Sequence, residues 1–352
     1  MGLLRLLLAI GVVAAHAGSI GGLTLTAGSV SVQAFFIISG FYMAMVLTEK
    51  YVGSSAISTF FTNRALRLLP VYWIVLGLTV LASVLGAGKV FDWEQVSRLD
   101  IAAVSVMTMV NLALVGMDWI MFFAVDVVGA LYPTYDFASQ ILPAHRFLLV
   151  PQAWSISMEI IFYLLAPLLI MLKWYWAVAL VAATMFGRFW IYFVIGWSHD
   201  PWSYRFLPFE IGMFLLGMLS YKFSVWLHVS VRVKIPVAGT LTVLLLLITA
   251  LYQFIPHLPL GLKTYGYLLF VAIIIPFAFH CTKNLTVDRW LGELSYPLYV
   301  VHILVLRISG NVSPEVVLAI SLVVSVFLYH FVDKPIDRIR AIRAARTKSL
   351  FQ

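Results

Sequence analysis

The chain has 352 residues, of which 62% are hydrophobic and 11% are charged, with a net charge of +8. Long apolar runs recur from end to end, which excludes a soluble globular protein and predicts a polytopic membrane protein in a lipid bilayer. The positive charge does not indicate nucleic-acid binding, because five of the basic residues lie together in the tail after the last apolar run, where they are typical of a cytoplasmic anchor. These are Arg338, Arg340, Arg343, Arg346 and Lys348.

The first apolar segment, residues 3–18, carries two ionisable residues, Arg5 and His16. In a helix this spacing places them on nearly the same face, with roughly 16 Å of helix between them. Ionisable side chains are costly in hydrocarbon and usually face a bundle interior or a polar cavity. Residues 15–17 imitate a signal-peptide cleavage site. We expect the segment to be retained, because the rest of the chain is itself membrane-embedded.

Eleven apolar segments are long enough, or nearly so, to cross a bilayer. They are residues 3–18, 30–48, 67–86, 99–117, 154–172, 175–196, 206–221, 236–255, 264–281, 291–308 and 314–332. Basic residues follow the second, seventh, ninth and last segments, which predicts that these gaps are cytoplasmic. That pattern agrees with a cytoplasmic N-terminus only if one segment fails to cross, and we assign residues 99–117 as re-entrant or interfacial.

The resulting prediction is an all-α transmembrane bundle of about ten crossing helices, with both termini in the cytoplasm. Residues 1–333 form a single membrane-embedded domain, and residues 334–352 form a basic cytoplasmic tail. Residues 118–132 make a poor span because they carry Asp118 and Asp126. Residues 133–153 are the longest non-membrane stretch and fall on the outer side.

Polar side chains recur at helical spacing inside two of the predicted spans. They are Ser155, Glu159 and Tyr163 in the first, and Ser295, Tyr299 and His302 in the second. His16 lies near the outer end of its segment, and Glu210 enters the seventh segment from the outer side. Two histidines and two carboxylates therefore share the outer half. Ser295 and Tyr299 also fit a purely structural role in hydrogen bonding between helices.

At the opposite surface, Arg64 and Arg67 lie three residues apart on one helical face, just before the third segment. Two guanidinium groups so placed suit phosphates that arrive from the cytoplasm. Ordinary anchoring at the positive inner surface is an equally good interpretation of the pair.

Five short motifs follow one another along the chain. They are Arg5 and His16 with ten residues between them, the FFIISG segment at residues 35–40, Arg64-x-x-Arg67, Trp154-Ser-x-Ser-x-Glu159 and Ser295-Tyr296-x-Leu298-Tyr299-x-x-His302. Together they resemble the integral-membrane acyltransferase family 3 over essentially the whole chain. Two positions differ from the family pattern. Gln33 stands where an acidic residue is common, and Ile160 and Ile161 stand where a second polar pair is common.

The resemblance implies a bacterial inner-membrane enzyme that takes an acyl group, commonly acetyl, from cytoplasmic acyl-CoA. The acceptor would be a hydroxyl of a surface polysaccharide, a lipid-linked sugar or a similar molecule. The resemblance also implies that His16 is essential and that Arg64 and Arg67 bind the donor. We expect no metal and no cofactor other than the acyl-CoA co-substrate. Transfer would finish in the membrane part or on a separate partner from envelope-polysaccharide biosynthesis.

Acyl transfer from a thioester to an alcohol needs a base for the attacking hydroxyl and stabilisation for the oxyanion. His16 is the candidate base, or the residue that takes the acyl group itself. Glu159 is the candidate for orienting a histidine. Ser39 and Gly40, a small pair that breaks the second segment, would expose N–H groups to the oxyanion, and Arg5 would line the donor's route. A secondary pocket is expected from Ser39, Gly40, Ser155, Tyr299, His302 and Glu210.

Two other classes of function use the same residues. A transporter or flippase would move a sugar or lipid-linked saccharide through the polar cavity without covalent chemistry, although the sequence has no paired repeats that would support this. A non-catalytic scaffold in an envelope-polymer assembly would retain its activity after His16→Ala.

Overall fold

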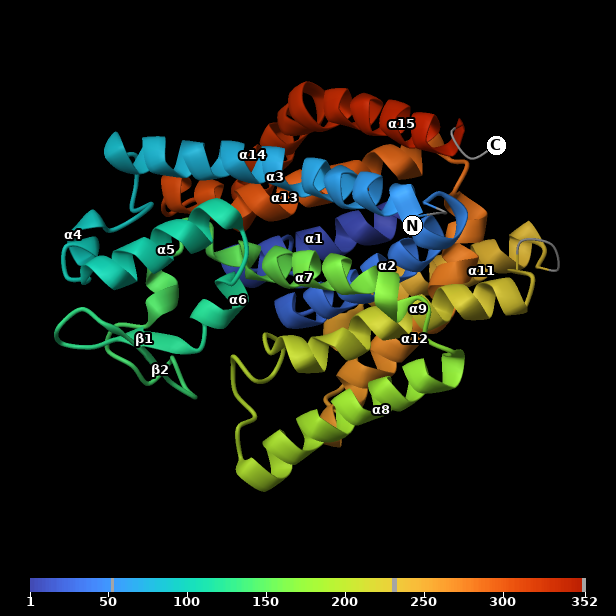
Figure 1. The fold of residues 1–352 in the computed structure, drawn as a ribbon, viewed down its shortest axis with the longest axis horizontal. Coiled ribbons are helices and arrows are strands. Elements are labelled where there is room, and N and C mark those ends of the chain that lie inside the picture. Colours follow the sequence, from blue (N-terminus) through green and yellow to red (C-terminus); the bar gives the residue numbers. More distant parts are fainter. Residues whose placement is uncertain (52–53, 230–232, 350–352) are drawn as a thin grey trace.

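The computed structural model describes residues 1–51, 54–229 and 233–349. These residues form a bundle of α-helices with one small antiparallel hairpin of β1 (Phe123–Val125) and β2 (Leu131–Pro133) (Figure 1). The helices are α1 (Gly2–Ala17), α2 (Gly28–Glu49), α3 (Ser54–Val84), α4 (Trp93–Val96), α5 (Ile101–Ala113), α6 (Met117–Ile120), α7 (Trp154–Leu169), α8 (Trp174–Trp190), α9 (Leu207–Trp226), α11 (Ile235–Ala250), α12 (Leu262–Thr282), α13 (Thr286–Ser309), α14 (Pro314–Leu328) and α15 (Lys334–Ser349). All eleven predicted apolar segments correspond to helices, which confirms the all-α polytopic fold.

The helices differ in whether they can span a membrane. Within the described residues, seven are long and apolar enough to cross, counting α14 and α15 as one continuous helix, and α1, α5 and α11 are shorter apolar helices. Helix α5 has 13 residues, which gives it a length of about 20 Å against a hydrocarbon core of about 30 Å. Helices α1 and α11, with 16 residues each, are also shorter than the hydrocarbon core, so the assignment of residues 99–117 as non-crossing stays a prediction.

The bundle has two distinct ends (Figure 1). The start of α1 and helix α15 lie toward one end, which we call the termini end. The β1–β2 hairpin lies at the opposite end, which we call the hairpin end. This arrangement agrees with two termini on one side of the membrane. That this side is the cytoplasm stays a prediction.

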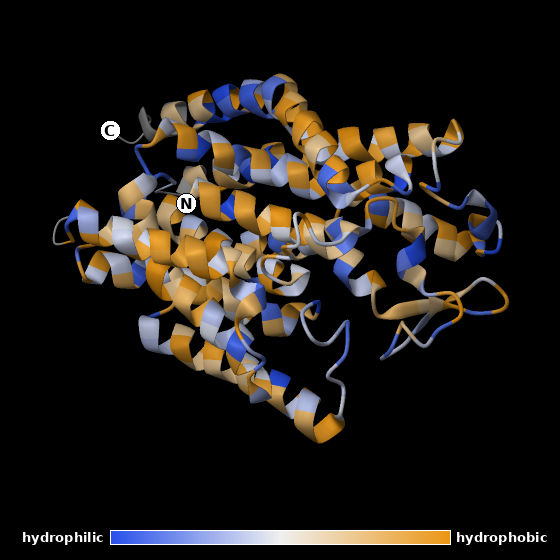
Figure 2. Ribbon diagram, turned by 180° about the vertical axis from the view of Figure 1, so that it is seen from behind, coloured by the Kyte–Doolittle hydropathy of each residue, from blue (hydrophilic) through white to orange (hydrophobic). Residues whose placement is uncertain are grey.

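Hydrophobic residues predominate along most of the helices (Figure 2). Many large apolar side chains are exposed on the outside of the bundle, as expected for helices that face lipid. Helix α8 is an example, because only 6% of its most hydrophobic 18-residue stretch is buried in the protein. Hydrophilic residues are concentrated on α15 and in the loops. Residues 334–349 of the predicted tail form α15, which packs along α3 through a hydrogen bond from the Asn63 side chain to the Arg340 carbonyl.

Helix α2 lies in the interior and packs closely on α9. A Cβ atom added at Gly40 would lie 1.9 Å from the carbonyl oxygen of Phe214, and one added at Gly217 would lie 1.9 Å from that of Ile37. The prediction that Ser39 and Gly40 break the second segment is wrong, since α2 is continuous through both residues. The glycine is there because the backbone of α9 approaches it.

Candidate active site

A cavity of about 690 Å³ lies between α1, α2, α3, α7, α13 and α15. Seven Arg and Lys side chains and four Asp and Glu side chains line it. The basic residues are Arg5, Lys50, Arg64, Arg67, Lys283, Arg289 and Arg340, and the acidic ones are Glu159, Asp288, Glu293 and Asp337. The excess of positive charge makes the cavity suitable for an anionic ligand.

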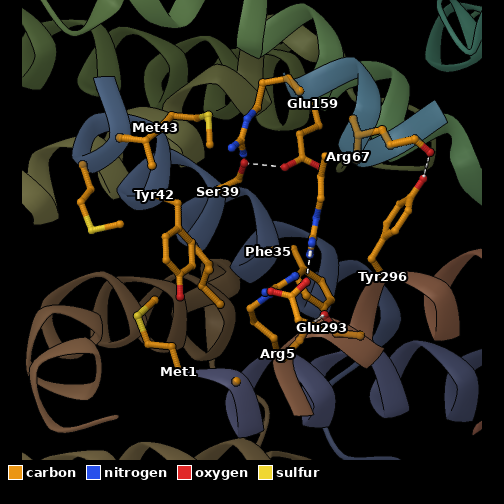
Figure 3. Close-up of a pocket in the computed structure, with 18 of the residues that line it drawn as sticks. Met1, Arg5, Phe35, Ser39, Tyr42, Met43, Arg67, Glu159, Glu293 and Tyr296 are labelled. Carbon is orange, nitrogen blue, oxygen red and sulfur yellow. Dashed lines mark hydrogen bonds and ion pairs between the residues drawn. The ribbon is translucent and has the colours of Figure 1, made fainter. Parts of the chain in front are cut away.

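Arg67 is held by carboxylates within the protein (Figure 3). Its guanidinium forms an ion pair with Glu293 of α13, and it lies 3.8 Å from a carboxylate oxygen of Asp337 on α15. The side chain therefore ties α3 to two other helices. Arg5 lies beside Glu293 as well. Neither carboxylate stood out in the sequence, although Glu293 lies two residues before the Ser295–His302 motif.

Arg64 differs from its neighbour on the same helix face. Its Nε is buried and has no hydrogen-bond partner, and its guanidinium carbon lies 5.8 Å from the ring centroids of both Phe60 and Tyr163. No carboxylate within the described residues forms an ion pair with it. Buried donors in proteins are usually paired, so the Nε–H group of Arg64 is a candidate for hydrogen bonding to a ligand in the cavity.

Glu159 lies in the same cavity as Ser39 and Tyr163. The Ser39 hydroxyl donates a hydrogen bond of 2.5 Å to the Glu159 carboxylate, and the Tyr163 hydroxyl donates to the same oxygen. Ser155, Glu159 and Tyr163 all line the cavity, as the predicted polar stripe requires. The hydrogen bonds of Glu159 in the described chain go to these two hydroxyls and not to a histidine, so no contact supports its predicted orienting role.

His16 pairs with His302 at the hairpin end of α1. Nδ1 of His302 lies 2.7 Å from the Tyr299 carbonyl, and its Nε2 lies 3.3 Å from Nδ1 of His16. Because a carbonyl only accepts, His302 carries its proton on Nδ1 and accepts at Nε2. Nδ1 of His16, which is also 2.9 Å from the Val12 carbonyl, is then the donor. This arrangement leaves the lone pair of His16 on Nε2, in a side chain that is exposed.

A family model described as an acyltransferase domain, Acyl_transf_3, matches residues 1–332. The chain belongs to the acyltransferase 3 family. It is thus a multi-pass membrane protein with an acyltransferase domain, and the match includes both histidines and every cavity residue outside α15. No curated protein and no solved structure matches the chain.

Of the residues predicted for the secondary pocket of this acyltransferase, Ser39, Ser155 and Tyr299 line the cavity, whereas Glu210, Gly40 and His302 do not. Glu210 is buried elsewhere. It is 0% exposed, accepts a hydrogen bond of 2.6 Å from Arg188 of α8 and receives two more from the Gln33 side chain. The pair joins α8 and α9, and Gln33 links it to α2. The sequence contains a signal for this pair. Arg188 lies inside an apolar span, where an arginine needs a buried hydrogen-bond acceptor.

The acyltransferase gives no indication of a metal centre in the part of the chain that the structure describes. No group of three or more His, Cys, Asp or Glu side chains there is placed to hold a metal ion.

Proposed function

We propose that this membrane acyltransferase transfers an acyl group, with acetyl as the first candidate, from acyl-CoA to a hydroxyl of a cell-envelope or exported saccharide. One observation carries the proposal. The cationic cavity extends from the termini end to Tyr299, and His302, the partner of His16, follows Tyr299 one helical turn later on α13. An acyl-CoA donor has phosphates at one end and a thioester at the other. Its phosphates would lie in the basic part of the cavity, and its thioester would lie near the histidines.

The phosphates of the donor would bind at the termini end of the cavity. Arg64 and Arg5 are the candidate ligands, because guanidinium groups form strong, directional hydrogen bonds with phosphate oxygens. The termini end would face the cytoplasm of a bacterium, where acyl-CoA is present, and the hairpin end would face outward from the inner membrane. The positively charged residues near the termini end support this orientation.

The arm of the donor would extend past Glu159 toward the histidines. Its amide N–H groups need acceptors inside the cavity, and a carboxylate provides them. Ser39 and Tyr163 already hold that carboxylate in place, so Glu159 would position the arm without a change in its own conformation.

At the hairpin end, Nε2 of His16 would take the proton of the acceptor hydroxyl as its oxygen attacks the thioester carbonyl. The bond from carbon to sulfur breaks, and the thiolate of CoA receives the proton. His302 would hold the imidazole of His16 in the required tautomer, which is the role of the third residue in a catalytic triad. Attack by Nε2 itself, with a transient acyl-histidine, uses the same lone pair.

The test is the release of CoA from radiolabelled acetyl-CoA by purified protein in nanodiscs, with candidate saccharide acceptors. We expect His16→Ala to lower the rate at least about 100-fold, the usual contribution of a general base. His257→Ala, which changes an exposed histidine in the α11–α12 connection, should retain the wild-type rate. Unchanged turnover in His16→Ala would exclude the proposed role. Label that stays on the wild-type protein would favour the covalent route, whereas saccharide movement without CoA release would favour the flippase.

A further inference from the structure

One tyrosine, Tyr299, contacts both the cavity and His302, the partner of His16. Tyr299 and Ser155 line the cavity, and neither His16 nor His302 does. The Tyr299 carbonyl accepts the hydrogen bond from His302, and the centroids of these two rings are 6.0 Å apart. The side chain of Tyr299 thus lines the cavity, while its backbone carbonyl contacts His302.

Hydrogen bonds hold the Tyr299 ring in this position. Its hydroxyl donates to the Gln152 carbonyl at 2.7 Å, and the Ser155 hydroxyl lies 2.6 Å from it. Since the phenol proton goes to the carbonyl, Ser155 is the donor in the second bond. The ring is 7% exposed and is fixed to α7 and to the 3₁₀ turn that precedes it.

Phe35 packs its ring against that of Tyr299. It lines the cavity one turn from Ser39 on α2, and its ring centroid lies 6.4 Å from that of Tyr299 in an edge-to-face arrangement. At that separation the two rings touch, so an acyl group passes between them only if one ring moves. The acyl group is the end of the donor that would enter this gap first. The width of the acyl group therefore decides whether the donor passes between the two rings.

We propose that Phe35 and Tyr299 determine the acyl specificity of the enzyme by forming a gate between the donor cavity and His16. This inference rests on the proposed function. The gate admits narrow acyl groups such as acetyl and rejects branched or aromatic ones, because a wider group requires a larger displacement of a ring that two hydrogen bonds hold. The closed ring also keeps water at the hairpin end from reaching the thioester before an acceptor binds.

The first experiment compares kcat/KM for acetyl-CoA, isobutyryl-CoA and benzoyl-CoA. Phe35→Ala and Tyr299→Ala should raise the benzoyl to acetyl ratio about tenfold or more, in line with the discrimination that a few buried carbons give. Tyr299→Phe keeps the ring and loses the hydroxyl, so it should mainly raise the hydrolysis of acetyl-CoA without acceptor. Tyr267→Phe removes a buried hydroxyl elsewhere, on α12, and should change neither quantity. A ratio that stays within twofold in both alanine variants would overturn the proposal, since loss of folded protein lowers all donors equally.

The second experiment needs no turnover and separates failure of the gate from failure of the proposed function. His16→Cys is made in a Cys281→Ser background, and a membrane-impermeant thiol reagent is applied to one face of reconstituted vesicles. We expect the introduced thiol to react only from the hairpin side while Tyr299 is intact. Addition of Tyr299→Ala should allow reaction from the termini side as well. Equal reaction from both sides with Tyr299 intact would show that no barrier exists.

Discussion

Arg64 and Arg67 lie three residues apart on α3, yet their surroundings differ. The charge of Arg67 is compensated by Glu293 and Asp337, whereas the Nε of Arg64 is buried without a partner. Their spacing predicts a shared face, and both residues do line the cavity. The carboxylates that make the two arginines unequal come from α13 and α15, so no local pattern around α3 identifies them.

We expect Arg64→Ala to weaken the binding of CoA about tenfold, because a charged hydrogen bond is worth about 1.5 to 3 kcal/mol. The thermal unfolding temperature should not change. Arg67→Ala should instead lower the free energy of unfolding by about 2 kcal/mol, since it leaves a partly buried carboxylate without its partner. The measurements are calorimetric titration with CoA and thermal unfolding in detergent.

The variant Arg67→Met with Glu293→Met serves as the control for this comparison. Removing both members of the pair should restore most of the stability lost in Arg67→Ala. If Arg67→Ala bound CoA far more weakly than Arg64→Ala while remaining fully stable, the assignment of the two arginines would be reversed.

Asp118 lies outside the membrane-spanning helices, and its protonation affects the stability of the folded protein. It is 2% exposed and accepts a hydrogen bond of 2.7 Å from Ser157. Burial raises the pKa of Asp118 to about 6 from its usual 3.8. The folded state therefore holds the proton more tightly than the unfolded state, and the free energy of unfolding falls as the pH rises through this interval.

Asp118→Asn removes the titrating group and keeps an oxygen that can accept from Ser157. We expect the variant to be more stable near neutral pH, by up to about 3 kcal/mol for a shift of about two pKa units. Below about pH 4 the difference should disappear. Thermal unfolding between pH 4 and 8 tests this, and an identical pH dependence in wild type and variant would contradict it.

At the scale of elements, the contact between α2 and α9 depends on two glycines that face the opposite backbone. Gly40 and Gly217 allow the helices to approach until a Cβ atom at either position would overlap a carbonyl oxygen. Small residues at helix contacts serve this purpose in membranes. A glycine in a helical segment is compatible both with a break in the helix and with close contact to another backbone. The sequence alone therefore does not distinguish these two roles for Gly40.

Gly217→Ala should lower the free energy of unfolding by about 2 kcal/mol, the usual cost of overpacking a buried contact. Gly266→Ala is the matched control, because Gly266 lies inside α12 with nothing within 4 Å of an added Cβ atom. That variant should be neutral or more stable by up to about 1 kcal/mol, since alanine favours a helix. Equal destabilisation by the two substitutions would mean that the effect comes from helix propensity and not from the contact.

At the scale of the whole molecule, the charge distribution and the histidine pair define two functional ends. The basic cavity lining faces the termini end, and His16 with His302 faces the hairpin end. In the predicted topology helix α5 does not cross the membrane, so the segments on either side of it would both lie at the hairpin end. An acyl group that enters at one end and leaves at the other would thus traverse the bundle through its interior.

Labelling of single cysteines in a Cys281→Ser background tests this topology. We expect Lys89→Cys and Ser139→Cys, which flank α5, to react with an impermeant reagent from one face of the membrane. Asn284→Cys, in the connection between α12 and α13, should react from the other face. Reaction of the first two positions from opposite faces would mean that residues 99–117 cross the membrane.

The order of the helices, the membrane class and the family could be predicted from the amino-acid sequence, because hydrophobic runs and short motifs are local properties of the chain. Four of the eleven charged side chains that line the cavity were also identified from the sequence, because a charge inside or beside an apolar span is conspicuous. These four are Arg5, Arg64, Arg67 and Glu159. The partners of the polar side chains became known only from the packing of the helices. It joined His16 to His302, Glu159 to Ser39, Arg67 to Glu293 and Glu210 to Arg188. The physical reason is that each partner comes from another helix, and a buried polar group bonds to whichever acceptor or donor the packing of the helices brings within about 3 Å.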